Sequence, residues 1–369
     1  MTSAAVAVVG AGIVGASVAY ALARSGARVL VLEAGTPGVG TSGTSFAWLN
    51  SVRKEPEVYH RLNAGGMAAY RELACELGED FGYHGGGSLE WAESAVDERE
   101  LRERVARLAS RGYAAEWISR DRALELESHL DIPASVCDVV FYAGDGWLDA
   151  PRVVRRLLDA AISRGADVRT GMPVRALRTR GDRVESIEIA NGDVVPGSIV
   201  VCVGPATAAF LAPLGVAMPV GRVPGLLAVT SRPSTPLGRV VHAPGIHLRP
   251  DAGGGLLLGA TDVDRLVEER SPSASLVEIA RSLLERAARA FRPARHVQLA
   301  DARVGVRPMP GDGHTIAGRI PGFTNAWVVA THSGVTLGAL LGRLIADEVL
   351  GKPASAKLAA FRPDRFVPR

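Results

Sequence analysis

The chain has 369 residues, of which 47% are apolar and 22% charged, the balance of a globular protein with a sizeable core. The formal charge is only +3, and there is no basic run of five residues and no apolar run approaching a membrane span, which argues against a nucleic-acid partner, a membrane span and an export signal. Three widely separated cysteines without a C-x-x-C pair exclude a disulfide framework and favour a cytoplasmic protein.

The first segment has the pattern of a βαβ unit. Val6–Val9 and Arg28–Glu33 are apolar runs typical of strands, and Ala16–Ser25 between them is rich in helix formers. The turn after the first strand carries Gly10, Gly12 and Gly15. This spacing gives a tight turn, bare backbone beside a pyrophosphate and close helix–strand packing. The alternative is an ordinary glycine-rich turn.

An acidic residue closes the second strand of this unit. Glu33 follows Gly15 at the distance where a carboxylate would accept hydrogen bonds from the adenosine ribose hydroxyls. The other interpretation is a solvated strand end. The first segment therefore predicts a dinucleotide site, but it does not distinguish FAD from NAD.

The rest of the chain alternates between strand and helix patterns, with short strands in the middle. Helices are expected at Val58–Leu77, Glu93–Arg111, Pro151–Ile162, Leu276–Phe291 and Leu337–Leu350. Strands are expected at Val168–Leu177, Val184–Ile189, Ser198–Val203 and Val328–Ala330, an antiparallel sheet within Val220–Gly259, and loops at Gly35–Ser45 and Ala143–Trp147. This order predicts an α/β protein, α+β overall, with two domains built from discontinuous segments.

Two features favour FAD over NAD. The hydroxyl-rich loop Thr41–Ser45 follows the acidic residue and has the groups to wrap a second phosphate, although a plain flexible loop has the same composition. The apolar run Ile199–Val203 ends at Gly204, as a strand passing a cofactor would.

The sequence resembles the FAD-dependent oxidoreductases of the D-amino-acid oxidase, glycine oxidase and sarcosine oxidase group. The most specific part is Gly-Val-Arg-Pro at 305–308 followed by Thr-His-Ser-Gly-Val-Thr-Leu-Gly at 331–338. The match runs nearly from end to end and includes Val6–Glu33, Gly86–Glu90, Asp145–Pro151, Val200–Thr207, Pro250–Thr261, Gly305–Pro308 and Asn325–Ile345.

The resemblance implies a Rossmann-like FAD-binding domain at 1–82, 146–217 and 302–369, and an antiparallel-sheet substrate domain at 83–145 and 218–301. The isoalloxazine would lie at their junction. The implied reaction is hydride transfer from a small amino acid or secondary amine to flavin N5, which gives an imine that hydrolyses. The partners would be a small carboxylate-bearing amine and dioxygen or another electron acceptor.

The resemblance also implies the residues that act on the substrate. Arg307 matches the family arginine that holds the substrate carboxylate, with Arg303 on the same strand face as the competing choice and a structural salt bridge as the alternative. His242 and His247 flank Pro244-Gly245, a turn that brings both rings together, at positions where glycine-oxidase-like members have tyrosines. They are expected to donate hydrogen bonds or shift the pH optimum, although many histidines are structural; metal binding by the pair is not expected.

The segment His332–Leu337 resembles the one that passes the flavin pyrimidine edge, where backbone N–H groups and a helix N-terminus stabilise reduced flavin. A plain strand-to-helix loop is the alternative. His332 joins Arg307, His247 and His242 as a catalytic candidate. The expected cofactor-binding residues are Gly10, Gly12, Ile13, Val14, Gly15, Glu33, Ala34, Thr41, Ser42, Thr44, Ser45, Val174, Gly204, Arg307, Gly334, Val335, Thr336 and Leu337.

Two departures from the family affect chemistry. Gly305 stands where sarcosine-oxidase-like members carry the flavin-linking cysteine, so noncovalent FAD is expected. The segment Leu256–Gly259 has no counterpart of their oxygen-activating lysine. Both an oxidase, which uses dioxygen, and a dehydrogenase, which uses another electron acceptor, therefore agree with the sequence. Other interpretations are an FAD-dependent 2-hydroxy-acid dehydrogenase, a nicotinamide-dependent dehydrogenase, and the flavin subunit of a larger amine dehydrogenase.

Overall fold

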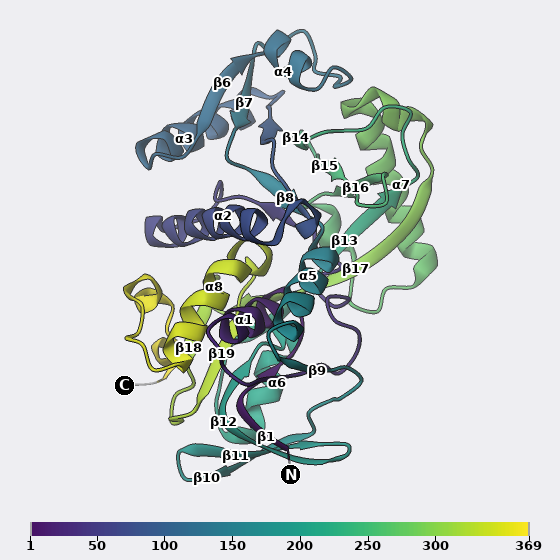
Figure 1. Cartoon of the computed structure of the whole chain (residues 1–369). Coiled ribbons are helices and arrows are strands. Elements are labelled where there is room, and N and C mark those ends of the chain that lie inside the picture. The colour runs from purple at the N-terminus through teal and green to yellow at the C-terminus, as the bar shows by residue number, and fades with distance from the viewer. Residues whose placement is uncertain (1, 368–369) are drawn as a thin grey trace.

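The computed structural model describes residues 2–367, which form three β-sheets and eight α-helices (Figure 1). One large sheet lies in the lower half of Figure 1 and the other in the upper half. The helices are α1 (Ile13–Arg24), α2 (Glu57–Leu77), α3 (Ala95–Ser110), α4 (Arg120–Leu126), α5 (Ala150–Ile162), α6 (Thr207–Leu211), α7 (Ser273–Ala290) and α8 (Gly334–Val349).

The lower sheet contains the expected βαβ unit. Its strands are β1 (Thr2–Val9), β2 (Val29–Leu32), β9 (Asp167–Arg169), β10 (Ala176–Arg180), β11 (Arg183–Ile189), β12 (Gly192–Val201), β18 (Ile316–Arg319) and β19 (Ala326–Ala330). Strand β1 pairs in parallel with β2 on one side and β12 on the other, and β19 pairs in parallel with β12. Parallel strands covered on both faces are built from continuous apolar runs, and all four residues of β2 are buried.

The upper sheet is mainly antiparallel. Its order is β17-β13-β16-β15-β14-β5-β7-β6, and β14 and β5 are its parallel neighbours. A third, small sheet has the order β3-β8-β4. The bounds are β5 (Ser88–Glu90), β6 (Ala115–Ser119), β7 (Asp138–Tyr142), β13 (Val220–Thr230), β14 (Val240–Ala243), β15 (Ile246–Pro250), β16 (Leu256–Gly259) and β17 (Leu299–Pro310), with β3 (Trp48–Leu49), β4 (Tyr83–His84) and β8 (Gly146–Leu148) in the small sheet.

Helix α1 lies in the core between α5 and α8. Small residues make this close packing possible: a Cβ on Gly342 of α8 would lie 2.6 Å from the backbone of Ser17 in α1. Helix α5 begins as its sequence predicts, because Asp149 accepts a hydrogen bond from the backbone N–H of Arg152 and Pro151 occupies the first turn. The packing of α1 fixes the position of its N-terminus.

The structure confirms the α/β class and the combination of a Rossmann-like sheet with an antiparallel one. Several element boundaries were wrong. The expected strand Val168–Leu177 is two strands, β9 and β10, because Gly171 has a φ of 66° and Pro173 lacks an N–H for the ladder. The expected loop Ala143–Trp147 includes the first residues of β8. Helices α1 and α8 each begin three residues before the predicted start, at Ile13 and Gly334.

Candidate active site

A cavity of about 820 Å³ runs between the two large sheets and is lined from both. One end meets the carboxyl ends of β1 and β2, where parallel sheets bind ligands. The other end meets β14, β15 and β17. Its lining includes these predicted residues: Gly10, Gly12, Ile13, Val14, Glu33, Ala34, Thr41, Ser42, Thr44, Ser45, Val174, Gly204, His242, His247, Arg307, His332, Gly334, Val335 and Thr336.

Two predicted residues, Gly15 and Leu337, lie outside this lining. A Cβ on Gly15 would lie 1.9 Å from the carbonyl oxygen of Gly10, so this glycine permits close contact of helix and strand, as the third glycine of the motif does. Leu337 is fully buried and packs in the core around α1. Its side chain therefore packs in the core and does not line the cavity.

The glycine turn presents bare backbone to the cavity. Gly10 has a φ of 96°, and a Cβ there would lie 2.5 Å from the Cys202 carbonyl oxygen, so a side chain is excluded on both grounds. Gly12 is the N-cap of α1, and no side chain at that position caps the helix. The backbone N–H groups and positive dipole end of α1 thus face the cavity, which suits a phosphate.

Glu33 stands at the end of β2 with its carboxylate fixed by backbone donors. Its two oxygens accept hydrogen bonds from Ala11 N–H at 2.7 Å and Gly35 N–H at 2.8 Å. Each carboxylate oxygen keeps a further acceptor position, so Glu33 remains able to accept from ribose hydroxyls. The residue lines the cavity.

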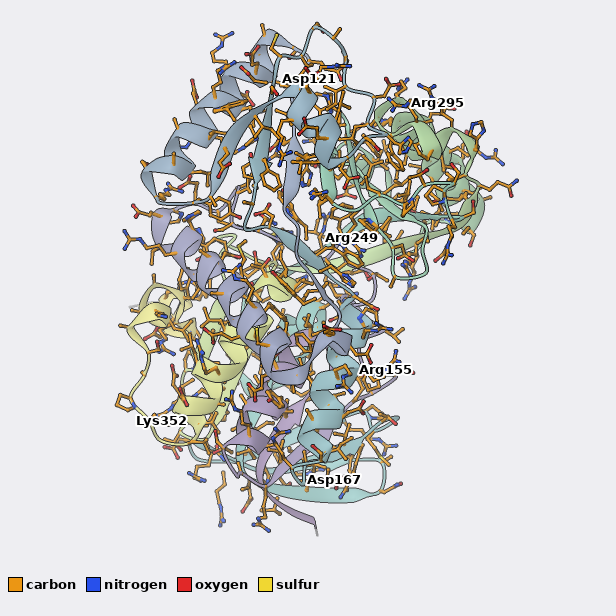
Figure 2. All side chains as sticks on the ribbon, turned by 45° about the horizontal axis from the view of Figure 1, so that its top comes forward. Asp121, Arg155, Asp167, Arg249, Arg295 and Lys352 are labelled. Carbon is orange, nitrogen blue, oxygen red and sulfur yellow. The ribbon has the colours of Figure 1, made fainter. Side chains whose placement is uncertain are left out.

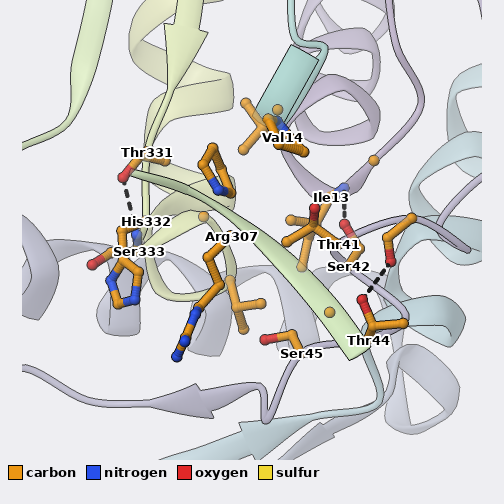
Figure 3. Close-up of a pocket in the computed structure, with 18 of the residues that line it drawn as sticks. Ile13, Val14, Thr41, Ser42, Thr44, Ser45, Arg307, Thr331, His332 and Ser333 are labelled. Atoms are coloured by element: carbon orange, nitrogen blue, oxygen red, sulfur yellow. Dashed lines mark hydrogen bonds between the residues drawn. The ribbon is translucent and has the colours of Figure 1, made fainter. Parts of the chain in front are cut away.

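The loop Thr41–Ser45 is anchored at two points. Ser42 Oγ accepts from the Ile13 N–H at 2.9 Å, and Thr41 Oγ1 donates to the Val306 carbonyl at 2.6 Å. A Cβ on Gly305 would lie 2.2 Å from the Thr44 carbonyl oxygen, so glycine at 305 lets the loop lie directly against β17. Figure 3 shows this loop facing the N-terminal segment of α1. A chain fixed in this way can surround an extended dinucleotide.

The N-terminus of α8 also points at the cavity. Its N-cap residue Ser333 makes no side-chain cap, while its hydroxyl accepts from Tyr59 and its N–H donates to Thr331 Oγ1. Burial, with the charges of Lys54 and Arg307, lowers the pKa of His332 to about 4. His332 is therefore neutral at pH 7, beside a second positive helix end.

Arg307 reaches the cavity from β17 but already has a protein partner. Its Nη1 forms an ion pair with Asp264 Oδ2 at 2.8 Å, and its Nη2 donates to the Pro224 carbonyl at 2.7 Å. Its Nε is buried without a hydrogen-bond partner among the described residues. The side chain is 34% exposed, and Figure 3 shows it projecting from β17 toward the side on which the His332 ring lies. Arg307 thus keeps donor capacity for an anion.

Two neighbours shape this position. A Cβ on Gly225 would lie 2.7 Å from Arg307 Nη2, so Gly225 on β13 makes room for the guanidinium. Burial raises the pKa of Asp264, and the Arg307 charge opposes that effect. Arg303, the competing arginine, lies outside the cavity lining, and its nearest carboxylate contact is Asp301 at 3.8 Å.

His242 and His247 face each other across the hairpin of β14 and β15, as the Pro244-Gly245 turn predicted. Their Nδ1 atoms are 2.8 Å apart, so one ring donates and the other accepts. Burial holds the pKa of His242 well below its ordinary value and lowers that of His247 to about 4. Both rings are neutral at pH 7. His242 also lies 4.0 Å, centroid to centroid, from the Trp48 ring.

Several cavity residues were not predicted. Trp48 is fixed by its indole N–H, which donates to the buried Asp145 at 2.9 Å, and Tyr113 and Ser88 donate to the same carboxylate. Burial raises the pKa of Asp145 to about 7. Lys54 was missed as well, although it is one of only three lysines in the chain, and that rarity was the signal that could have found it.

Neither a metal site nor a membrane-spanning helix is found within residues 2–367. No set of three or more His, Cys, Asp and Glu side chains there is arranged to hold a metal ion. No helix in the same range has the length and apolarity needed to cross a membrane.

Comparisons with known proteins agree with the geometry. The model of the family described as FAD dependent oxidoreductase matches residues 5–348. The glycine oxidase of Geobacillus kaustophilus is 27% identical and covers 98% of this chain and 97% of its own; its crystal structure superposes with a TM-score of 0.88 over 100% of both chains. The D-amino acid dehydrogenase of Methylobacterium nodulans is 28% identical, over 94% of this chain and 95% of its own.

Proposed function

The chain belongs to the DAO family of FAD-dependent oxidoreductases, and from that premise we propose that it oxidises the C–N bond of a small amino acid or secondary amine. The observation that carries this proposal is that Arg307, His242 and His247 line the antiparallel-sheet side of a cavity whose other end suits a dinucleotide. The family match shows that the chain is an oxidoreductase. Our proposal concerns its substrate and the roles of these three residues.

The residues of the cavity fit FAD held without a covalent bond. The glycine turn, Glu33 and the loop Thr41–Ser45 would hold the dinucleotide, and the N-terminus of α8 would face the flavin. Gly305, where related enzymes carry the linking cysteine, has no reactive side chain. Bound FAD would supply a hydride acceptor for the substrate carbon next to nitrogen.

Arg307 is proposed to hold the substrate carboxylate. The Nη hydrogens that are not used toward Asp264 and Pro224 offer charged hydrogen bonds, whereas Nε is buried. Fixing the carboxylate at one point orients the rest of a small substrate, which is the main contribution that a protein makes when the cofactor carries the chemistry.

The histidine pair is proposed to orient the amine. A base with a pKa of about 4 is a poor proton acceptor at pH 7, so His247 is unsuited to removing the ammonium proton. A neutral imidazole instead offers an acceptor nitrogen to an amine N–H. On this account the amine binds in its neutral form, and the apolar faces of Trp48 and Leu227 help to exclude water around it.

The relatives support amine chemistry without fixing one substrate. Their names include glycine oxidase, D-amino acid dehydrogenase and opine oxidase, all of which denote oxidation next to an amino nitrogen. They also span oxidases and a dehydrogenase. We therefore propose dioxygen or another electron acceptor as the second partner.

The test is a comparison of Arg307→Ala with Arg303→Ala, a matched change on the same strand face. We expect Arg307→Ala to lower kcat/KM for a carboxylate-bearing amine by about 100-fold, since charged hydrogen bonds contribute about 1.5–3 kcal/mol each. Arg303→Ala, outside the cavity, should change it by less than about threefold. Equal losses in the two variants, at normal FAD content, would show that Arg307 has no special part in binding.

A further inference from the structure

Lys54 lies in the cavity on the turn between β3 and α2. It shares the cavity lining with Arg307 and His332. The turn is well fixed: Asn50 Oδ1 accepts from the Val52 N–H at 3.1 Å, and the Glu55 carbonyl is 2.9 Å from His314 Nε2. The position of Lys54 therefore follows from the fold and not from a loose surface loop.

The cations around Lys54 all have a carboxylate partner. Arg53 pairs with Glu90 at 3.0 Å, Arg111 with Glu55 at 2.6 Å, and Arg307 with Asp264. Lys54 forms no ion pair and no side-chain hydrogen bond with any residue between 2 and 367. Its ammonium is thus left with the cavity as the direction in which an anion can approach.

Burial of this ammonium has a measurable consequence. Desolvation lowers the pKa of Lys54 to about 8, which still leaves it mostly protonated at pH 7. The same two cations, Lys54 and Arg307, depress the pKa of His332, so both act on one side of the cavity. The other lysines lie on the surface, where Lys352 pairs with Asp347 at 2.7 Å and Lys357 is exposed.

Charge at the substrate end of the cavity is unbalanced by two units. Arg53 and Arg104 share the single carboxylate of Glu90, since both approach its Oε1. Arg53, Lys54, Arg307 and Asp264 line the cavity, and Arg104 and Glu90 lie behind Arg53. Together these four cations and two carboxylates leave a surplus of two positive charges. Asp262 does not reduce it because Arg286 pairs with it at 2.8 Å, and the three histidines that line the cavity are neutral. Asp145, buried with a pKa of about 7, offsets part of a charge at most.

We propose that Lys54 binds a second carboxylate of the substrate, so that the substrate is an amino dicarboxylate or an N-carboxyalkyl amino acid. This inference rests on the proposed function, in which Arg307 holds the first carboxylate. A dicarboxylate with a neutral amine carries two negative charges, which matches the surplus at this end of the cavity. A monocarboxylate would leave one buried cation without a partner, which is costly.

The test uses substrate pairs of equal size that differ in one charge: glutamate and glutamine, aspartate and asparagine, in both configurations, and iminodiacetate and its monoamide. Anaerobic reduction of the holoenzyme gives the second-order rate for each. We expect at least one carboxylate to be preferred over its carboxamide by about 10- to 100-fold, the range of a charged hydrogen bond. If every carboxamide reacts as well as its carboxylate, this inference is wrong while the proposed function stands. If no amine at all reduces the flavin, the proposed function fails first.

Variants then assign the preference to Lys54. Lys54→Met, similar in size but neutral, should reduce the carboxylate preference to less than about threefold, and Lys54→Arg should retain part of it. The surface change Lys357→Met is the control and should leave the preference intact. A Lys54→Met enzyme that loses rate equally on both members of a pair, or only reoxidises more slowly in air, would overturn the assignment to a second carboxylate.

Discussion

At the scale of single residues, the site depends on histidines that are neutral and on arginines that are paired with carboxylates. The turn at Pro244-Gly245 predicted that His242 and His247 converge. The choice of Arg307 came from the family resemblance, because the strand face alone did not distinguish it from Arg303. The sequence did not predict Asp264 as the partner of Arg307. Asp264 comes from a short 3₁₀ helix at Val263–Leu266, and no local pattern relates its position to β17.

The neutral histidine pair makes the protein sensitive to acid. The pKa of each ring is depressed in the folded state, that of His247 to about 4 from an ordinary value of 6.5. Between these values the unfolded chain binds more protons, so the free energy of unfolding falls as pH decreases through this window. The free energy of unfolding should therefore fall less with acid in the double variant His242→Gln/His247→Gln. Between pH 7 and pH 4.5 we expect its fall to be smaller than that of the native protein by about 1–3 kcal/mol.

Denaturant unfolding at a series of pH values measures this difference. The exposed change His296→Gln is the control and should retain the native pH dependence. A double variant whose stability falls with acid as steeply as that of the native protein would show that the pair is not held neutral.

At the scale of elements, two helix N-termini define the cofactor end. Helices α1 and α8 pack against each other and both begin at the cavity, and neither N-cap residue, Gly12 or Ser333, caps its own helix with a side chain. At position 12 a Cβ would meet only Ser42 Oγ, at 3.3 Å, whereas at position 10 it would meet backbone. A side chain at position 12 would therefore enter the cavity without displacing the backbone of the fold.

We expect Gly12→Val to weaken FAD binding by about tenfold or more, because a branched side chain would occupy the place of the pyrophosphate. Titration of the apoprotein with FAD, followed by flavin fluorescence, gives the dissociation constant. Gly144→Ala is the matched control, since it lies outside the cavity and its Cβ would meet nothing within 4 Å. Unchanged affinity in Gly12→Val would place the pyrophosphate elsewhere.

Element types were more predictable than element ends. Strong periodicity located α2, α5 and α7 to within a few residues. Helices α1 and α8 were placed too late because their first turns consist of glycine and β-branched residues, which have low intrinsic helix propensity. Tertiary packing overrides that preference at Ile13–Val14 and Gly334–Val335. Two of the three helix starts that were predicted three residues late, those of α1 and α8, thus face the cofactor cavity, whereas the start of α7 at Ser273 does not.

Sequence also could not show how distant segments close the cavity. Lys54 and Trp48 come from a short segment before α2 that has no motif, and their place opposite Arg307 depends on β3 pairing with β8. That pairing joins residues about a hundred positions apart in the chain. Local patterns find the cofactor turn, whereas the substrate end needs the tertiary fold.

At the scale of the whole molecule, the cavity lies where the two large sheets meet. Figure 2 shows Arg249 between the halves, and this buried side chain joins them, since its Nε donates to the Phe46 carbonyl and its guanidinium lies 4.7 Å from the centroid of the Trp147 ring. We propose that the halves are discontinuous domains, an FAD-binding one at 1–82, 146–217 and 302–369 and a substrate-binding one at 83–145 and 218–301. Strand β17 crosses one of these boundaries and carries Arg307 into the shared cavity.

The most direct test of amine oxidation is the visible spectrum of the purified holoenzyme before and after anaerobic addition of amino acids, N-alkyl amino acids, amino dicarboxylates and 2-hydroxy acids. We predict that the flavin absorbance is lost with at least one amine and persists with the 2-hydroxy acids. Loss of absorbance with 2-hydroxy acids alone, or a protein that stays colourless after incubation with FAD, would contradict the account.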